Sequence, residues 1–145
     1  MYNNNCKGTL IMAKLNKEEQ EIVDKLHEVL GFSNPPKITQ ERFDAIVEEL
    51  IKEDKRETMW RLCGIYIGYN FNKVIDYYIE KKDSYYVEEL VCFVNGELDQ
   101  EYLVNKMIET NDKEFVKACL ELYGNTMQYC MDNEWLEKLL DFVKN

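Results

Sequence analysis

The sequence predicts an all-α fold: a short right-handed superhelix of stacked two-helix repeats (an α-solenoid), with an N-terminal helix and a C-terminal capping helix. The first observation behind this prediction is a self-match. Shifted by 29 positions, residues 74–96 align with residues 103–125, and shifted by 28, residues 46–66 align with residues 74–94. A fixed period of this length is typical of stacked supersecondary units.

The second observation is helical periodicity within each unit. In the central unit Val74, Tyr78 and their neighbours Ile75 and Ile79 recur at the spacing that places side chains on one face of a helix. Four identities fix the alignment with the next unit: Ile79 with Ile108, Glu80 with Glu109, Asp83 with Asp112, and Val87 with Val116. Apolar residues match in kind around them, as Phe93 does with Leu122. Helices of roughly ten residues are marginal by themselves, so the units are expected to bury their faces by stacking.

Residues 1–11 show no periodicity, and residues 1–15 are expected to be a disordered or frayed N-terminus. Met12 is an alternative to Met1 as the translation start, because a clear helix signal follows it. We base no function on this segment.

Residues 16–38 are predicted to form an N-terminal helix and a Pro-Pro linker. The helix is expected over Lys17–Leu30. Asn16 and Glu19 have the capping-box spacing, and Gly31 stands where a C′ glycine belongs.

Residues 39–145 form the predicted helical-repeat domain. Its approximate repeats are 39–72, 73–101, 102–131 and a half-repeat 132–145. Thr39 is the expected N-cap of the first repeat, and a last helix, Glu134–Val143, ends the array. Further caps are expected at Asp83, Asp99, Asp112 and Asp132, and helix ends at Asn95-Gly96 and Gly124-Asn125.

The pattern resembles the general class of two-helix solenoids and is HEAT- or armadillo-like in general architecture. The resemblance goes no further than that class. The signatures of tetratricopeptide, ankyrin and leucine-rich repeats are absent, and the unit is shorter than a HEAT or armadillo repeat.

Composition and charge favour a soluble cytoplasmic protein. The chain has 145 residues, a formal net charge of −10 and no long apolar run. Its start lacks the layout of a signal peptide. The negative charge predicts no direct binding to nucleic acid and none to membranes, since both use clustered Lys and Arg. Five cysteines without a Cys-x-x-Cys pair suggest a reducing compartment rather than a disulfide framework.

The search for chemistry predicts no catalytic residue, no cofactor and no metal ion. The chain has one histidine, His27, expected to be exposed on a helix, and no phosphate-binding glycine motif. Gly64 and Gly68 are interpreted as marking close helix packing. Two acidic pairs, Glu48-Glu49 and Glu88-Glu89, are expected on a solvated face, because adjacent helical residues point about 100° apart.

A surface for a partner protein remains. Second helices of stacked hairpins commonly line the concave side, where such proteins bind partners. We expect the contact to be lined by Trp60, Tyr85, Glu89, Glu114 and Glu121. The competing interpretation is that the large aromatic side chains cover the edges of a thin core, and that the charge serves solubility.

The predicted function is a non-enzymatic protein-binding module. The favoured form is a small acidic stoichiometric inhibitor, of the immunity or phage anti-defence type, that occupies a basic surface of a partner protein. The alternative is a passive adaptor or scaffold subunit with helical repeats. An enzyme with an unrecognised site is the third hypothesis.

Overall fold

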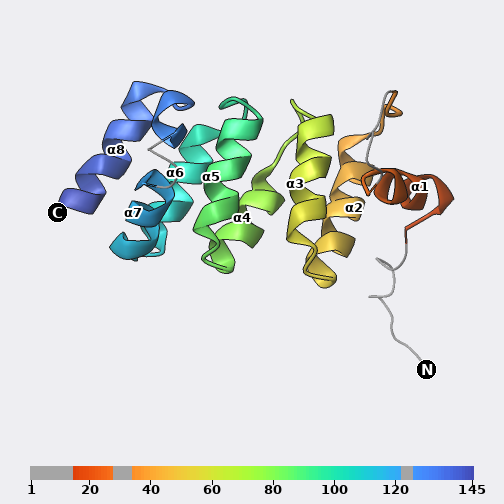
Figure 1. Ribbon diagram of the computed structural model, residues 1–145, viewed down its shortest axis with the longest axis horizontal. Helices are drawn as coiled ribbons and strands as arrows, with labels where there is room; N and C mark the ends of the chain where they lie inside the picture. Colours follow the sequence, from red (N-terminus) through yellow and green to blue (C-terminus); the bar gives the residue numbers. More distant parts are fainter. Residues whose placement is uncertain (1–14, 28–33, 122–125) are drawn as a thin grey trace. The chain divides into compact units, whose positions relative to one another are not determined.

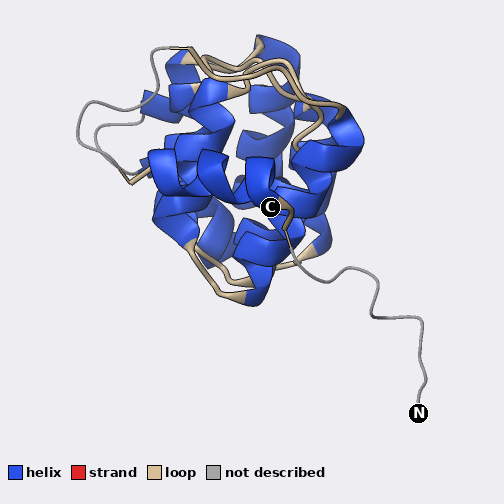
Figure 2. Cartoon of the chain, turned by 90° about the vertical axis from the view of Figure 1, so that its right-hand side faces the viewer, coloured by secondary structure: helices blue, strands red, loops and turns tan. Residues whose placement is uncertain are grey.

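The computed structural model describes residues 15–27, 34–121 and 126–145, and this part of the chain is helical, without a strand (Figures 1 and 2). Its elements are α1 (Lys17–Lys25), α2 (Gln40–Lys52), α3 (Arg56–Ile65), α4 (Asn72–Glu80), α5 (Ser84–Phe93), α6 (Gln100–Glu109), α7 (Lys113–Glu121), the 3₁₀ helix η3 (Thr126–Tyr129) and α8 (Asn133–Lys144). The prediction of an all-α fold is confirmed for these residues. None of the described helices is both long enough and apolar enough to cross a membrane.

The chain divides into two compact units, one ending at Thr58 and the other beginning at Met59. This division lies inside α3, so the first predicted repeat, residues 39–72, belongs to both units.

In the first unit α1 begins as predicted. The side chain of Asn16 accepts a hydrogen bond from the Glu19 amide at 2.8 Å, and the Glu19 carboxylate accepts one from the Asn16 amide at 3.0 Å. α1 packs against α2, where Arg42 forms ion pairs with Glu18 and Glu19. Thr39 caps α2 as predicted, accepting from the Arg42 amide at 3.2 Å.

The end of the first helix differs from the prediction. α1 ends at Lys25, and His27 is exposed in the turn that follows instead of lying within the helix. The predicted stop at Gly31 lies outside the described residues.

In the second unit every second helix of the chain lies side by side: α4 with α6, α5 with α7, and α6 with α8. α4 packs against α5 and α6, α5 packs against α7, and α8 packs against both α6 and α7. Polar contacts join these neighbours: the Tyr102 hydroxyl donates to Asp76 at 2.7 Å, and Lys138 donates to Asn105 at 3.2 Å. Within this unit each helix therefore packs against helices that are near it in the chain.

The core of the second unit is formed by the apolar face that the periodicity predicts. Its most deeply buried side chains include Met59, Leu62, Val74, Ile75, Tyr78, Leu90, Val91, Leu103, Val104, Met107, Val116, Cys119, Met127 and Leu139.

The turn between paired helices repeats with the sequence. Asp54, Lys82 and Asn111 have φ angles of 53°, 52° and 53°, and they are spaced by 28 and 29 residues. In each turn the amide of this residue donates to the carbonyl three residues earlier: Ile51 at 3.0 Å, Ile79 at 2.9 Å and Ile108 at 2.9 Å. The left-handed region is unfavourable for side chains other than glycine. The 28- and 29-residue period therefore recurs as backbone geometry.

Most of the predicted caps are present. Asp83, Asp99 and Asp112 accept from the amides of Tyr86, Tyr102 and Phe115 at 3.1, 3.0 and 3.0 Å. Asn95 and Gly96 end α5 with φ angles of 52° and 76°.

Two predicted turn residues have other outcomes. Asp132 stands at the N-cap of α8, but its side chain makes no cap hydrogen bond, and its backbone amide donates to the Gln100 side chain at 2.8 Å. The predicted stop at Gly124-Asn125 lies outside the described residues.

Candidate functional site

Three side chains of α5 form one surface stripe, which we call the α5 stripe: Tyr85, Glu89 and Phe93. They are four residues apart, so they lie on the same face of the helix, over about 12 Å at 1.5 Å per residue. Tyr85 and Phe93 are each 42% exposed, whereas Glu89 between them is partly buried. The stripe therefore presents an aromatic ring at each end and a carboxylate in the middle.

Phe93 is held flat against α3. Its ring stacks on Trp60 with centroids 4.2 Å apart and planes inclined by 21°. One turn after Trp60, Gly64 leaves room for the same ring, because a Cβ atom there would lie 2.0 Å from the Phe93 Cε2 atom. The ring is thus fixed by packing, although Phe93 as a residue is 42% exposed.

The Gly64 packing confirms one half of the glycine interpretation. Gly68 does not mark helix packing: it lies in an exposed turn after α3, with a φ angle of 101° and open space around it. Its positive φ explains the glycine there.

Tyr85 is anchored through a chain of rings. It lies edge-on to Tyr86 with centroids 4.9 Å apart, and Tyr86 stacks on the buried Tyr78 at 5.4 Å. Both aromatic ends of the stripe are therefore connected to the core of the second unit, which restricts their freedom in advance of any contact.

The expectation for the acidic pair on α5 is wrong for Glu88. Its side chain is 1% exposed, and the Cys92 thiol donates to its Oε2 atom at 3.4 Å. Three elements pack against α5: α4, α7 and η3. The face of α5 that is exposed to solvent is therefore narrower than its periodicity suggests. Glu48 and Glu49 of α2 stay partly exposed.

Glu89 lies at the edge of this covered region. Desolvation, followed by repulsion from Glu88 and a hydrogen bond between the two carboxyl groups, raises the pKa of Glu89 above its ordinary value. The surroundings of Glu89 within the chain therefore favour its neutral form over its ionised form more than water does.

Two further predicted residues lie on α7, which packs beside α5. Glu114 and Glu121 are exposed, and the exposed Lys117 lies between them along the helix. The charge on this helix is therefore mixed. The five predicted residues are distributed over α3, α5 and α7, and their joint use as one contact surface stays a prediction.

Phe93 is the site residue that sequence reasoning missed. The sequence matched it to Leu122 only as an apolar residue of the repeat, and the structure places it on the surface. The available signal was its spacing, since Tyr85, Glu89 and Phe93 repeat every four residues on a face separate from the buried Val87, Leu90 and Val91.

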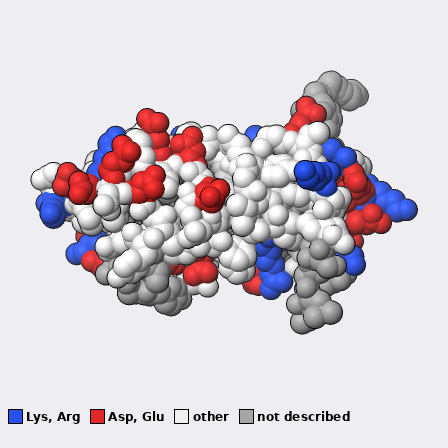
Figure 3. Space-filling view, turned by 90° about the horizontal axis from the view of Figure 1, so that it is seen from above, with Lys and Arg blue, Asp and Glu red and all other residues white. Residues whose placement is uncertain are grey.

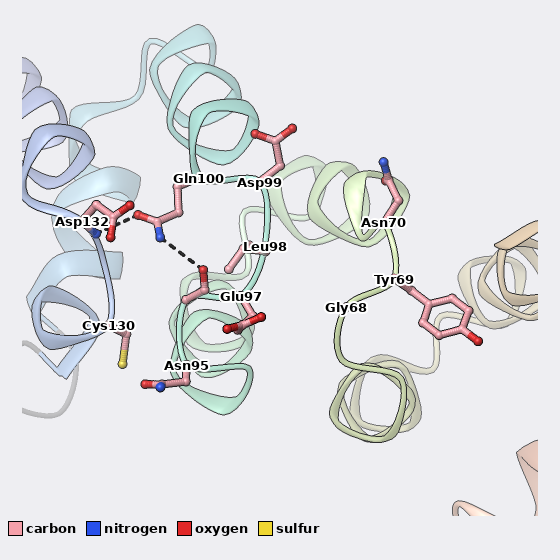
Figure 4. Close-up of a pocket in the computed structure, with 11 residues that line it drawn as sticks. Gly68, Tyr69, Asn70, Asn95, Glu97, Leu98, Asp99, Gln100, Cys130 and Asp132 are labelled. Carbon is pink, nitrogen blue, oxygen red and sulfur yellow. Dashed lines mark hydrogen bonds between the residues drawn. The ribbon is translucent and has the colours of Figure 1, made fainter. Parts of the chain in front are cut away.

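A second feature is a hollow of about 720 Å³ formed by three loops of the second unit (Figure 4). The loops contribute residues 68–70, 95–100, and Cys130 with Asp132. Gln100 lies between two of them, donating to the Gly96 carbonyl at 3.2 Å and accepting from the Asp132 amide. The lining includes the exposed carboxylates Glu97, Asp99 and Asp132. Figure 3, which views this side, shows acidic side chains gathered over the part that carries α6 and α8.

The described cysteines are free thiols: Cys63, Cys92, Cys119 and Cys130. Burial raises the pKa of the Cys63 thiol strongly and that of Cys119 to about 12, so both keep their protons and act as core side chains. Within the described ranges no three His, Cys, Asp or Glu side chains come together in a way that could hold a metal ion.

Comparisons with known proteins add no relative to this description. No protein-family model, no curated protein and no solved structure matches this chain.

Proposed function

We propose that the chain is a non-enzymatic helical-repeat protein that binds another protein through the α5 stripe and the adjoining Trp60. One observation carries the proposal: Phe93 keeps 42% of its surface exposed although it is stacked on Trp60 and fitted over Gly64. An exposed aromatic ring that is already immobilised loses little conformational freedom on binding. Such rings, surrounded by polar groups, are typical of the residues that dominate interface energies.

The solenoid belongs to the same proposal. Like helices lie side by side in the second unit, and three equivalent turns recur at 28 and 29 residues. These features support a right-handed superhelix of stacked hairpins, in which α3, α5 and α7 would provide the binding face.

Charge favours a basic partner. The chain has a formal net charge of −10, Glu89 belongs to the α5 stripe, and Glu114 and Glu121 are exposed on the neighbouring α7. An acidic face would attract a basic surface and speed association at low salt, as complementary potentials do.

Within this proposal the protein acts as a stoichiometric inhibitor in the cytoplasm, and the immunity and anti-defence types are its favoured forms. Free thiols at the four described cysteines support a reducing compartment. A passive adaptor is the second candidate. The mixed charge of α7 favours it, because such a surface discriminates less between basic and other partners than an all-acidic face does.

The experiment compares two variants of a partner complex with wild type. Phe93→Ala removes the aromatic end of the stripe, and a triple charge reversal replaces Glu89, Glu114 and Glu121 by Lys; helical circular dichroism checks that each variant folds. The proposal expects at least about tenfold weaker binding for each, roughly 1.4 kcal/mol. Glu137→Lys, at an exposed site on α8, is the charge control and should bind normally.

Inhibitor and adaptor differ in the effect on the partner. An inhibitor suppresses the partner's activity completely at one molar equivalent, while an adaptor binds and leaves that activity intact. Unchanged binding of both variants would contradict the proposed face.

A further inference from the structure

We infer that the Trp60–Phe93 stack and the Glu89 carboxylate together form a binding site for one arginine side chain of the partner. The inference rests on the proposed function and names the chemical group that its binding face selects.

Three aromatic rings of the second unit, other than the Trp60–Phe93 pair, lie near a lysine of the chain. Lys82 lies 5.7 Å from the ring centroid of Phe115, Lys106 lies 5.6 Å from that of Tyr102, and Lys138 lies 5.7 Å from that of Trp135. These rings thus have a cation supplied by the chain itself. Phe93 is 42% exposed, more than any of these three rings, and its own ring is stacked on Trp60.

Glu89 lies close to the Phe93 ring along α5. It precedes Phe93 by four residues on the same face, a spacing that brings Cβ atoms to about 5–6 Å. A planar cation resting on the Phe93 ring would therefore have a carboxylate within reach at its edge. The buried Glu88 is the preceding residue in the chain, and its carboxyl group is hydrogen-bonded to that of Glu89.

An aromatic stack beside a carboxylate suits a guanidinium better than an ammonium group. A guanidinium is planar, stacks on aromatic faces and donates two parallel hydrogen bonds to a carboxylate, whereas an ammonium is a compact and strongly hydrated charge. The stack offers the flat surface, and Glu89 offers the acceptor. The raised pKa of Glu89 fits a carboxylate whose charge is stabilised once the cation arrives.

Charge separates this occupant from two others. A second copy of the chain would bring another formal charge of −10, and a nucleic acid would bring phosphates. Both would meet the carboxylates of the face with like charge.

The test uses a fluorescence reporter within the chain. The sequence has two tryptophans, so Trp135→Phe leaves Trp60 as the one emitter. The probes are three capped peptides of alanine and leucine that differ at one central position: arginine, its uncharged analogue citrulline, or lysine. Trp60 emission is followed as each peptide is added at low salt.

The expected result is a saturable change in Trp60 emission with the arginine peptide, and binding at least about tenfold weaker with citrulline. Lysine should be intermediate. In the Trp135→Phe background, Glu89→Gln should weaken the arginine peptide while leaving the citrulline peptide unchanged, so that the two substitutions are coupled. Phe93→Ala should abolish the change, and Glu137→Gln is the matched control.

Equal binding of the arginine and citrulline peptides would overturn the inference, as would the absence of any emission change with the arginine peptide up to millimolar concentration. The proposed function is judged separately, by the partner complex. Suppose that Phe93→Ala weakens that complex while the citrulline and arginine peptides bind with equal affinity. The α5 stripe then binds the partner through apolar contacts, and the arginine assignment fails. If Phe93→Ala and the triple charge reversal both leave the complex unchanged, the proposed function itself fails.

Discussion

The ammonium group of Lys82 lies 2.7 Å from the Oδ2 atom of Asp112, and this ion pair joins the turn after α4 to the turn after α6. The two residues come from adjacent units of the repeat. Asp112 also caps α7 through its other carboxylate oxygen. One side chain therefore contributes both to the helix start and to the contact between neighbouring turns.

Lys82→Met should raise the pKa of Asp112. The hydrogen bond from Lys82, followed by the one from the Phe115 amide, holds this pKa below its ordinary value. A depressed pKa contributes stability above the unfolded-state pKa, and this contribution is lost as the pH falls through the folded-state pKa. The variant should therefore unfold at lower urea concentration than wild type at pH 7, with a difference that disappears in acid. Nuclear magnetic resonance titration of Asp112 gives the pKa directly. Lys81→Met, at an exposed neighbour, is the control, and an unchanged Asp112 titration in Lys82→Met would contradict the account.

Asn111→Val should destabilise the protein by about 1–2 kcal/mol, because a β-branched side chain is strained at a φ angle of 53°. Urea unfolding provides the measurement. Glycine adopts this conformation without strain, so Asn111→Gly should be at least as stable as wild type. A valine variant equal in stability to wild type would show that the turn is not constrained as described.

Glu89→Gln should change the pH dependence of stability in the opposite direction to the Asp112 case. A raised folded-state pKa means that folding favours the protonated acid, so stability falls as the pH rises from the unfolded-state pKa to the folded-state pKa. Glutamine removes this loss. The variant should match or exceed wild type in urea unfolding at pH 7, and its advantage should vanish in acid. A variant that is less stable than wild type at pH 7 would contradict the assignment of desolvation as the main cause.

Leu90→Asp should prevent folding, because the side chain is 1% exposed and an unpaired buried charge costs several kcal/mol. Ile67→Asp, at a site that is 47% exposed, should keep the helical circular dichroism spectrum of wild type. A folded Leu90→Asp protein would mean that α5 does not contribute to the core as described.

The sequence predicted local structure well where one residue determines it. Asn16, Thr39, Asp83 and Asp112 cap helices because their side chains reach amides two or three residues on, a relation visible in the spacing itself. The spacing of the turns was visible through the isoleucines that precede them, Ile51, Ile79 and Ile108. The residues with positive φ angles differ from turn to turn: Asp54, Lys82 and Asn111.

Prediction failed where the environment comes from elsewhere in the chain. Glu88 was expected in solvent, yet neighbours packed around α5 cover it. Phe93 was matched to an apolar residue of the next unit, but its position depends on Gly64 and Trp60, about 30 residues earlier in the sequence. Asp132 stands at a cap position, and its backbone is engaged by Gln100 instead. Periodicity along one helix carries no information about such distant contacts.

The central claim, that the α5 stripe is the surface on which a partner binds, is tested most directly by site-specific photo-crosslinking in the cells that make the protein. A photoreactive phenylalanine analogue is placed at position 85 or 93 in the stripe, or at exposed position 137 on α8 as the control. The account predicts one discrete crosslinked product from positions 85 and 93, containing a basic polypeptide, and none from position 137. No product from either stripe position, or the same product from position 137, would contradict it.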